Sequence, residues 1–253
     1  WHSPCFFNLA KVMDLTMNNA RNNGKQVGPV TGEITTFTCI EDVIEAYHKQ
    51  LSYFVRQLVD NLNCIDFAFA EKAPLSFQSA LIEDCIARGK SVQEGGAVYN
   101  FTGPQGIAVA DAGDCLYAIQ KNVFEDKKIT LAQLKDALDH NFGQRVITGG
   151  ASAAAEPSTQ PRSCLDAAAA QASSAQLLDV VRAVLNGAAP SSAAGGSTGS
   201  YADIQSLLDN TPSYGNDNDD ADYYAALVAR LYCEEMAKYR NPRGGQFQAA
   251  LFP

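Results

Sequence analysis

The chain has 253 residues, 46% of them hydrophobic, which is enough for one large core or two modest ones. Its formal net charge is −9 without a basic stripe, so nucleic acid is not an expected partner, because Lys and Arg must neutralise phosphates. No apolar run approaches the roughly 20 residues of a membrane span. The seven cysteines are scattered without a C-x-x-C pair. That usage favours a reduced protein of the cytoplasm, or of an organelle matrix if the source is eukaryotic.

Helices are predicted for most of the first 90 residues, because apolar side chains recur there at helical spacing. The expected elements are a helix over 6–21 with a left-handed cap at 22–24, a long helix from Thr38 through Leu62 that could extend over 64–70, and a helix over 76–89. Thr38 and Glu41 have the spacing of a capping box, and Ser76 is the expected cap of the third helix. Pro74 forces the break before it.

The most informative stretch runs from Gly89 to Gly106, where five glycines and a proline precede a short apolar strand predicted over 107–110. Glycine at this density marks turns or close approach of two backbones. A phosphate-binding loop is the alternative, but the Gly-Lys-Ser/Thr ending and the fingerprint glycine spacing are missing. A structural turn is therefore favoured.

Helices and turns are also predicted after the strand. The elements are a helix over 114–124, a helix over 131–141 that Thr130 and Gln133 open as a capping box and Gly143 stops, a short helix over 204–208, a turn at 214–216, a helix over 221–239 and a strand over 246–253. The carboxylates of 217–222 are expected to interact with a helix N-terminus, because the glycine and glutamate of a calcium loop are missing.

Between 149 and 200 the composition shifts to Ala, Ser, Gly and Pro, and only 175–185 keeps helical periodicity. Such a segment buries too little apolar area to offset its ordering. The expected organisation is a barrel segment with the glycine-rich motif over 1–143, a largely flexible insertion over 144–200, and a continuation of the barrel segment over 201–253. A Gly-x-Ser-x-Gly match at 195–199 has no strand before it and is not assigned as a nucleophile.

No residue is assigned a catalytic or metal-binding role. His2, His48 and His140 are isolated and show no metal-ligand spacing. Arg240 and Arg243 flank a proline turn and are expected to be solvated or to cap carbonyl groups. The alternation of long helices with short apolar strands indicates an α/β barrel or a layered α/β fold, and periodicity leaves that choice open.

Eight blocks, in order, resemble the glycyl radical enzyme family, in the pyruvate formate-lyase-like branch of glycerol dehydratase and choline trimethylamine-lyase. The blocks are Phe6–Val12, Gly24–Pro29 with Thr31-Gly32, Asp84–Ser91, the 94–106 motif running into Ala110-Asp111, Val123–Glu125, Leu138–Gly143, Tyr214–Asp217 and Tyr239–Gly245. The resemblance covers everything outside about 144–200.

The resemblance implies part of a ten-stranded α/β barrel, helix-rich and interrupted by the low-complexity insertion. In this family a thiyl cysteine and a radical glycine sit on two loops that meet at the barrel centre. An activating enzyme with S-adenosylmethionine and an iron–sulfur cluster installs the glycyl radical. The complete enzymes, homodimers of anaerobic metabolism, act as dehydratases, lyases or formate acetyltransferases and cleave C–O, C–N or C–C bonds. No bound cofactor is expected in this chain.

Both radical loops are missing from the sequence. The family's cysteine lies in a Gly-Cys-x-Glu context and its glycine in an Arg-Val-x-Gly-Tyr context, and neither occurs here. Cys5 lacks the neighbouring glycine and glutamate. The chain is therefore expected to be an internal fragment, inactive by itself, whose partners are the rest of the barrel or neighbouring chains. The alternatives are a non-catalytic, barrel-derived structural or assembly subunit, and a small-molecule binding module.

The resemblance also places four residues at the substrate pocket. Ser3, Phe6 and Phe7 align with a stretch that lines the pocket in the family, and Phe252 lies near the inward end of the last strand. The alternative is that these aromatic side chains are ordinary core residues.

Overall fold

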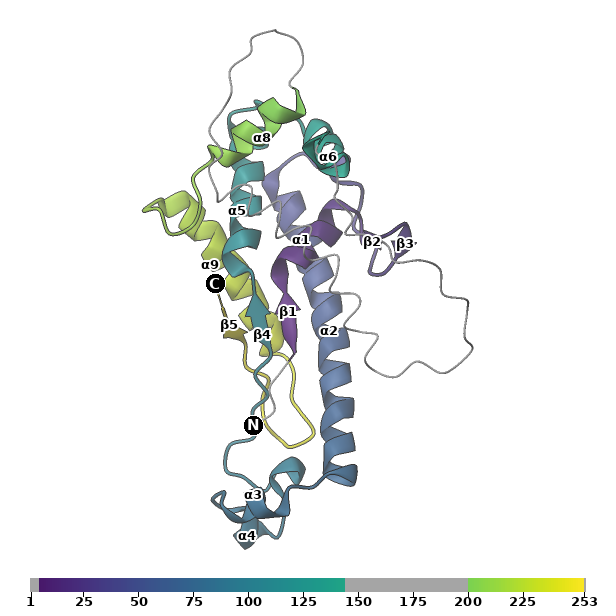
Figure 1. Cartoon of the computed structure of the whole chain (residues 1–253), viewed down its shortest axis with the longest axis vertical. Coiled ribbons are helices and arrows are strands. Elements are labelled where there is room, and N and C mark those ends of the chain that lie inside the picture. The colour runs from purple at the N-terminus through teal and green to yellow at the C-terminus, as the bar shows by residue number, and fades with distance from the viewer. Residues whose placement is uncertain (1–4, 144–199, 253) are drawn as a thin grey trace, which may run out of the picture. The chain divides into compact units, whose positions relative to one another are not determined.

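The computed structural model describes residues 5–143 and 200–252 (Figure 1). The chain divides into two compact units. Unit 1 consists of Trp1–Tyr117 and Pro212–Pro253, and unit 2 consists of Ala118–Thr211. No helix among the described residues is long and apolar enough to cross a membrane.

Unit 1 contains a three-stranded sheet of β1 (Phe6–Asn8), β4 (Gln105–Ile107) and β5 (Ala250–Leu251), with β4 in the middle (Figure 1). Both pairs are parallel, so each connection is a long crossover that carries helices. The unit's helices are α1 (Leu9–Met17), α2 (Ile40–Lys72), α3 (Ser76–Ala80), α4 (Cys85–Arg88), α9 (Asp219–Met236), the greater part of α5 (Val109–Ile119), and the short 3₁₀ turns η1 (Ile34–Thr36) and η2 (Val92–Glu94).

Helices α2 and α9 carry the core of unit 1. The 33-residue α2 confirms the long amphipathic helix, and its apolar stripe of Val43, Tyr47, Leu51 and Val55 is completely buried. On α9 the residues Val228, Tyr232 and Met236 are equally buried. The Tyr47 hydroxyl donates to the carbonyl of Leu9 at 3.3 Å, which satisfies the one polar atom of this stripe.

The predicted helix over 6–21 is wrong at both ends. Residues 6–8 are strand β1, and α1 begins at Leu9 because the Asn8 side chain accepts the backbone N–H of Lys11 as an N-cap. The Asn22–Gly24 segment is not a helix cap but a hairpin that joins β2 (Arg21–Asn22) to β3 (Lys25–Gln26). Its two central residues, Asn23 and Gly24, have φ of 49° and 74°, as a two-residue hairpin turn requires.

The first capping box is displaced by one residue. The carboxylate of Asp42, not of Glu41, accepts the N–H groups of Thr38 and Cys39 at 2.8 and 3.3 Å, so α2 begins at Ile40. The predicted strand over 107–110 is also shifted toward the N-terminus. Ala108 has a φ of 62°, which ends β4, and Val109 already begins α5.

The predicted helix over 76–89 is two short helices. Asp84 has a φ of 72°, a left-handed conformation that interrupts the helix between α3 and α4. Leu75 rather than Ser76 occupies the N-cap of α3. The predicted stop at Gly89 is confirmed, since its φ of 62° gives α4 a left-handed C-cap.

The acidic run before α9 has the predicted role. Asn218 caps the helix by accepting the N–H of Ala221 at 2.9 Å, and Asp219, Asp220 and Asp222 occupy the first turn. Negative charge there interacts favourably with the partial positive charge of the helix N-terminus.

Unit 2 comprises the end of α5 with a π-helical turn, η3 (Gln120–Glu125), followed by α6 (Leu131–Asp139), η4 (Asn141–Gly143) and α8 (Tyr201–Asp209). The predicted capping box of Thr130 and Gln133 is confirmed. Residues 144–199, and with them most of the predicted insertion and the periodic segment 175–185, lie outside the described residues.

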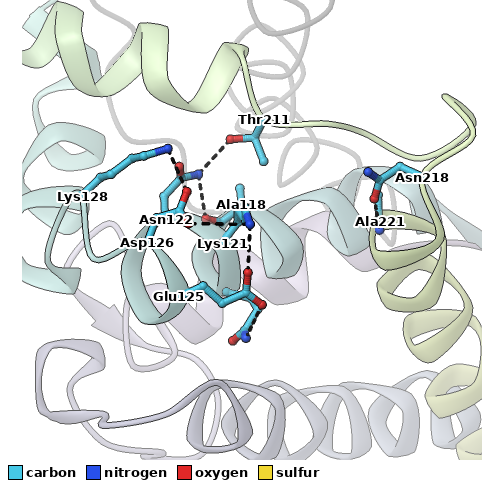
Figure 2. Close-up of polar contacts among 10 residues, drawn as sticks. Ala118, Lys121, Asn122, Glu125, Asp126, Lys128, Thr211, Asn218 and Ala221 are labelled. Carbon is cyan, nitrogen blue, oxygen red and sulfur yellow. Dashed lines mark hydrogen bonds and ion pairs between the residues drawn. The ribbon is translucent and has the colours of Figure 1, made fainter.

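The π-helical turn is organised around Asn122, which is only 2% exposed. Its side-chain nitrogen donates to the carbonyl of Ala118 at 3.0 Å and to the hydroxyl of Thr211 at 2.8 Å (Figure 2). Its carbonyl oxygen accepts the N–H groups of Lys128 and Ile129. Asn122 thus connects the widened turn to Thr211, shortly after α8, through its side-chain amide, and to the segment 128–129 through its backbone carbonyl.

The carboxylate of Glu235 on α9 is buried among hydrogen-bond donors. Glu235 accepts hydrogen bonds from Ser52 at 2.8 Å, from Lys238 and from Tyr239 at 3.3 Å, and His48 Nε2 lies 3.7 Å away. Burial on its own would raise the pKa of Glu235, but the hydrogen bonds from Lys238 and Ser52 outweigh it and hold that pKa below its usual range.

A carboxylate whose pKa is lower in the folded than in the unfolded protein stabilises the fold at every pH above the unfolded pKa, which is about 4.3 for glutamate. This stabilisation is lost as the pH falls from the unfolded pKa through the folded pKa. We therefore expect Glu235→Gln to lower the melting temperature at pH 7. Between pH 5 and pH 3, the melting temperature of this variant should fall less than that of the unsubstituted chain. Thermal melts followed by circular dichroism check this, with Glu45→Gln, an exposed carboxylate of α2, as control. Identical pH profiles for Glu235→Gln and the unsubstituted chain would contradict the assignment.

Candidate functional site

The two faces of the parallel sheet have different environments. A Cβ atom built on Gly106 of β4 would lie 2.6 Å from the ring of Tyr232. The Phe7 ring, beside Gly106 in the register, stacks on Tyr232 with centroids 5.5 Å apart. The Tyr232 hydroxyl donates to the carbonyl of Pro104 at 3.3 Å. Phe7 and Gly106 therefore face α9, and Tyr232 holds β1 and β4 against that helix.

The opposite face of the sheet is only partly covered by the described residues of unit 1. Because side chains alternate along a strand, it carries Phe6, Gln105 and Ala250, which are aligned in register, and then Phe252. Phe6 is 61% exposed and Phe252 is 47% exposed. We call these four residues the open sheet face. Of the predicted pocket residues, the structure brings Phe6 and Phe252 to this face.

The other two predicted pocket residues do not share it. Phe7 lies on the side of α9, as the alternative of an ordinary core residue expects, and Ser3 lies outside the described residues. The four-residue pocket assignment therefore stays a prediction.

Gln105 is the polar residue of this face, and the sequence did not single it out. It lies on the central strand between Phe6 and Ala250, and its amide makes no hydrogen bond to the described residues. A carboxamide offers two donors and one acceptor, so it can bind a hydroxyl or a carbonyl group. Only the strand register reveals its position, because three-residue strands show no alternation in the sequence.

Below the sheet, the glycine-rich loop and the turn of 239–245 interlock. Asn241 donates to the carbonyl of Asn100 at 2.6 Å and to the Thr102 hydroxyl at 2.8 Å. A Cβ atom on Gly95 would lie 2.5 Å from the carbonyl oxygen of Arg243, and one on Gly245 would overlap the carbonyl of Asn100. We call residues 95–103 and 239–245 the interlocked loops. Their glycines are needed for close backbone approach, which supports the structural interpretation of the motif.

The interlocked loops are anchored to α2 by a buried ion pair. Arg243 Nε lies 3.1 Å from the carboxylate of Asp66, and the two side chains are 3% and 4% exposed. Another guanidinium nitrogen donates to the Thr102 hydroxyl at 2.9 Å and to the Phe101 carbonyl at 3.4 Å. The expectation of a solvated Arg243 is therefore wrong, although its carbonyl contact was foreseen. Burial of the arginine shows a role in holding the loops together.

The block around Gly28-Pro29 is also held by side chains of the core. Gln50, which is completely buried, donates to the carbonyl of Pro29 at 2.8 Å and to the hydroxyl of Thr31 at 3.1 Å. Asn19 accepts the N–H groups of Thr31 and Gly32 at 2.8 and 3.2 Å. These hydrogen bonds fix the loop of residues 28–32 to α2 and to the segment after α1.

The described cysteines carry free thiols. Cys5 directly precedes β1, and burial raises the pKa of its thiol. Burial also raises the pKa of Cys115 on α5 to about 12. Both side chains are neutral at pH 7, whereas thiol nucleophiles and metal ligands act as thiolates. Within 5–143 and 200–252, no group of three or more His, Cys, Asp or Glu side chains is placed to hold a metal ion.

The chain belongs to the pyruvate formate-lyase-like family. The family model described as "PFL-like: Pyruvate formate lyase-like" matches residues 1–253. This confirms the resemblance stated from the eight sequence blocks.

Among curated relatives, (2S)-3-sulfopropanediol dehydratase of Klebsiella oxytoca is 27% identical over 255 residues, which cover 100% of this chain and 24% of the relative. Trans-4-hydroxy-L-proline dehydratase of Clostridioides difficile is 28% identical, with 98% of this chain and 25% of the relative covered. The chain therefore spans about a quarter of the length of the curated relatives it matches.

Solved structures give the same result. The glycerol-bound B12-independent glycerol dehydratase of Clostridium butyricum superposes with a TM-score of 0.74 and 36% identity, covering 98% of this chain and 24% of that one. A protein from a structural study of 1,2-propanediol dehydration in Roseburia inulinivorans superposes with a TM-score of 0.71 and 34% identity. The superposition covers 98% of this chain and 25% of that one. The helix-rich α/β class is thereby confirmed, with glycyl radical enzymes as the neighbours.

Proposed function

We propose that this chain is a segment of a glycyl radical enzyme of the dehydratase or lyase type and forms part of its barrel wall. The observation that carries the proposal is the superposition of 98% of the chain on 24% of glycerol dehydratase at 36% identity. Two blocks that match the family, the glycine-rich motif and the turn of 239–245, form the interlocked loops that support the sheet. The family resemblance therefore extends to parts that determine the fold.

In this proposal the parallel strands β1, β4 and β5 belong to a ten-stranded barrel, and the open sheet face looks toward its interior. The exposed side chains of Phe6 on β1 and of Phe252, directly after β5, would give the pocket apolar walls, with the Gln105 amide between them as the polar contact. The relatives are named for sulfopropanediol, hydroxyproline and glycerol, all hydroxylated small molecules. A hydroxyl on the substrate would suit the free amide.

The chemistry itself would require groups that this sequence lacks. The glycyl radical, installed by an S-adenosylmethionine-dependent activase, supplies hydrogen-atom abstraction in the complete enzyme. Neither radical loop occurs in the sequence, and Cys5 lacks the glycine and the glutamate that flank the thiyl cysteine in the family. The 253 residues alone are therefore proposed to be inactive, and the partners are the remaining barrel, the activase and a second copy in a cytoplasmic homodimer.

The proposal is tested by sequencing the transcript and expressing its whole reading frame. A Gly-Cys-x-Glu loop upstream, an Arg-Val-x-Gly-Tyr loop downstream and a glycyl doublet in electron paramagnetic resonance after activation are expected. A mature transcript that encodes no more than these 253 residues would overturn the proposal and favour a non-catalytic structural or assembly subunit. A glycyl doublet on the 253-residue chain itself would overturn the inactivity.

We also propose that most of 144–200 is an insertion that the fold does not need. The described residues on its two sides already meet, since the Tyr201 ring stacks on His140 at 5.6 Å and its hydroxyl donates to Asp136 at 2.8 Å. A Cβ atom on Gly143 would lie 3.4 Å from the Tyr201 ring.

Replacing 144–199 with a short Gly/Ser linker is therefore expected to leave the melting temperature of the chain within about 3 °C, because the ends to be joined are neighbours and loop length changes stability only slowly. Thermal melts of the two chains check this. Removal of an equally long segment that includes α8 is the control and should unfold unit 2. A large loss of stability on removing 144–199 alone would contradict the insertion.

A further inference from the structure

Exposed apolar side chains are concentrated at one end of unit 1. Of the eighteen large hydrophobic side chains exposed among the described residues, ten lie between Ile65 and Phe101. They are Ile65, Phe67, Phe69, Leu75, Phe77, Leu81, Ile86, Val98, Tyr99 and Phe101. We call this set the apolar end. It comprises the last turns of α2, the helices α3 and α4, which lie at the far end of α2 in Figure 1, and the glycine-rich loop.

The last turns of α2 show the pattern of an interior helix. The apolar stripe of α2 is buried through Val59, but the segment 64–70 is apolar around most of its circumference. Its residues Phe67 and Phe69 are 64% and 43% exposed. A helix that is apolar on all sides is normally surrounded by other elements. The described residues of unit 1 cover only one side of this segment.

The apolar end is ordered by its own contacts. Ser79 accepts the N–H of Val92 at 3.0 Å, and Gln93 accepts the N–H of Leu75 at 3.3 Å. Cys85, Val92 and Ala97 form a small buried cluster beneath it. The exposed side chains therefore stand on a preformed surface.

The charged side chains between Ile65 and Phe101 are of both signs. Arg88 pairs with Asp84 at 2.7 Å, and Lys72 pairs with Glu71. No cluster of Lys and Arg suits phosphates or an acidic membrane. The exposed parts of these ten side chains add up to on the order of 1,000 Å² of mainly apolar surface, an area similar to one side of a stable interface.

We propose that the apolar end is the surface on which the remaining polypeptide of the longer glycyl radical chain packs. This rests on the proposed function, because the relatives have about three quarters of their length outside the matched segment. A concentration of large aromatic and aliphatic side chains on one ordered surface resembles the inside of a domain more than a transient contact. The occupant is thus the same polypeptide, and a second copy of the chain is the competing occupant.

The test uses a chimera in which this chain replaces the matched quarter of the glycerol dehydratase of Clostridium butyricum. Phe77→Asp and Ile86→Asp change side chains that are 81% and 74% exposed. In the isolated chain both variants should keep the melting temperature within about 2 °C, because surface substitutions change stability little. In the chimera each should reduce the soluble yield at least tenfold. Val30→Asp, at a side chain 73% exposed outside the apolar end, is the matched control and should change neither quantity.

Chimeras with Phe77→Asp and Ile86→Asp that stay as soluble as the unsubstituted chimera would overturn the inference. So would an isolated chain that sediments as a dimer and is converted to monomers by these substitutions, since the occupant would then be a second copy. A second measurement does not depend on the chimera: in the glycerol dehydratase structure, the positions superposed on Phe77 and Ile86 should be covered by residues outside the matched quarter. If those positions are exposed in the glycerol dehydratase, or are covered by another subunit, the inference is overturned. If the unsubstituted chimera is itself insoluble, that result counts against the proposed function and not against this inference.

Discussion

Gly245→Ala is expected to lower the free energy of unfolding of unit 1 by about 3 kcal/mol. The added Cβ atom would overlap the carbonyl oxygen of Asn100, a backbone atom that cannot rotate away. That oxygen also accepts the hydrogen bond from Asn241 at 2.6 Å, so displacing it breaks the contact between the interlocked loops. Urea unfolding followed by circular dichroism measures the loss as a shift of the midpoint.

The same substitution at Gly103 is the matched control. Gly103 lies in the same pair of loops, but a Cβ atom there would be 3.7 Å from the nearest atom, the carbonyl oxygen of Gln248, which is ordinary contact. Gly103→Ala should therefore leave stability unchanged or raise it slightly, because alanine restricts the unfolded chain. Equal losses in the two variants would show that the interlocked loops are less tightly packed than the structure indicates.

Arg243→Leu is expected to be about as damaging, with a loss of about 3–5 kcal/mol. The substitution removes the guanidinium from the buried carboxylate of Asp66, and it removes the donor to the Thr102 hydroxyl at 2.9 Å. Burying a carboxylate without its cation is costly, because desolvation is no longer offset. Urea unfolding again measures the effect, and the melting temperature should fall by more than 10 °C.

Two comparisons separate the buried ion pair from simple loss of an arginine. Arg88→Leu breaks the pair with Asp84, whose side chains are 44% and 39% exposed, and should cost at most about 1 kcal/mol. The double variant Asp66→Leu with Arg243→Leu should recover at least half of the loss, because no charge is left buried alone. A double variant less stable than Arg243→Leu would show that Asp66 has a role beyond this pair.

The helices were predicted well wherever a long apolar stripe or a complete cap is present in the sequence. The stripe of α2 repeats over many turns, and Thr130 with Gln133 forms a capping box that needs only local contacts. The strands were predicted poorly. β1 and β4 have three residues each, too few for an alternating pattern, and the left-handed Ala108 that ends β4 has no signal in its residue type.

The assignment of pocket residues stays a prediction, and the structure shows only where two of them lie. Phe6 and Phe252 were named from the family resemblance, and the register brings them to one face of the sheet. In a strand, neighbouring side chains such as those of Phe6 and Phe7 point to opposite faces of the sheet. This difference was missed because the segment was predicted to be helical. The burial of Arg243 depends on Asp66, which is distant in sequence, so its ion pair could not be inferred from the proline turn.

The interlocked loops also constrain how the protein is made. Asn100 and Asn241 are 141 positions apart, and β5, the partner of β4, follows later still. A nascent chain leaving the ribosome therefore carries β4 for a long time with the edge that pairs with β5 exposed. Contacts of such long sequence separation form slowly, and exposed edges invite aggregation. Holding the growing chain on a chaperone until residue 250 has emerged would protect it during this interval.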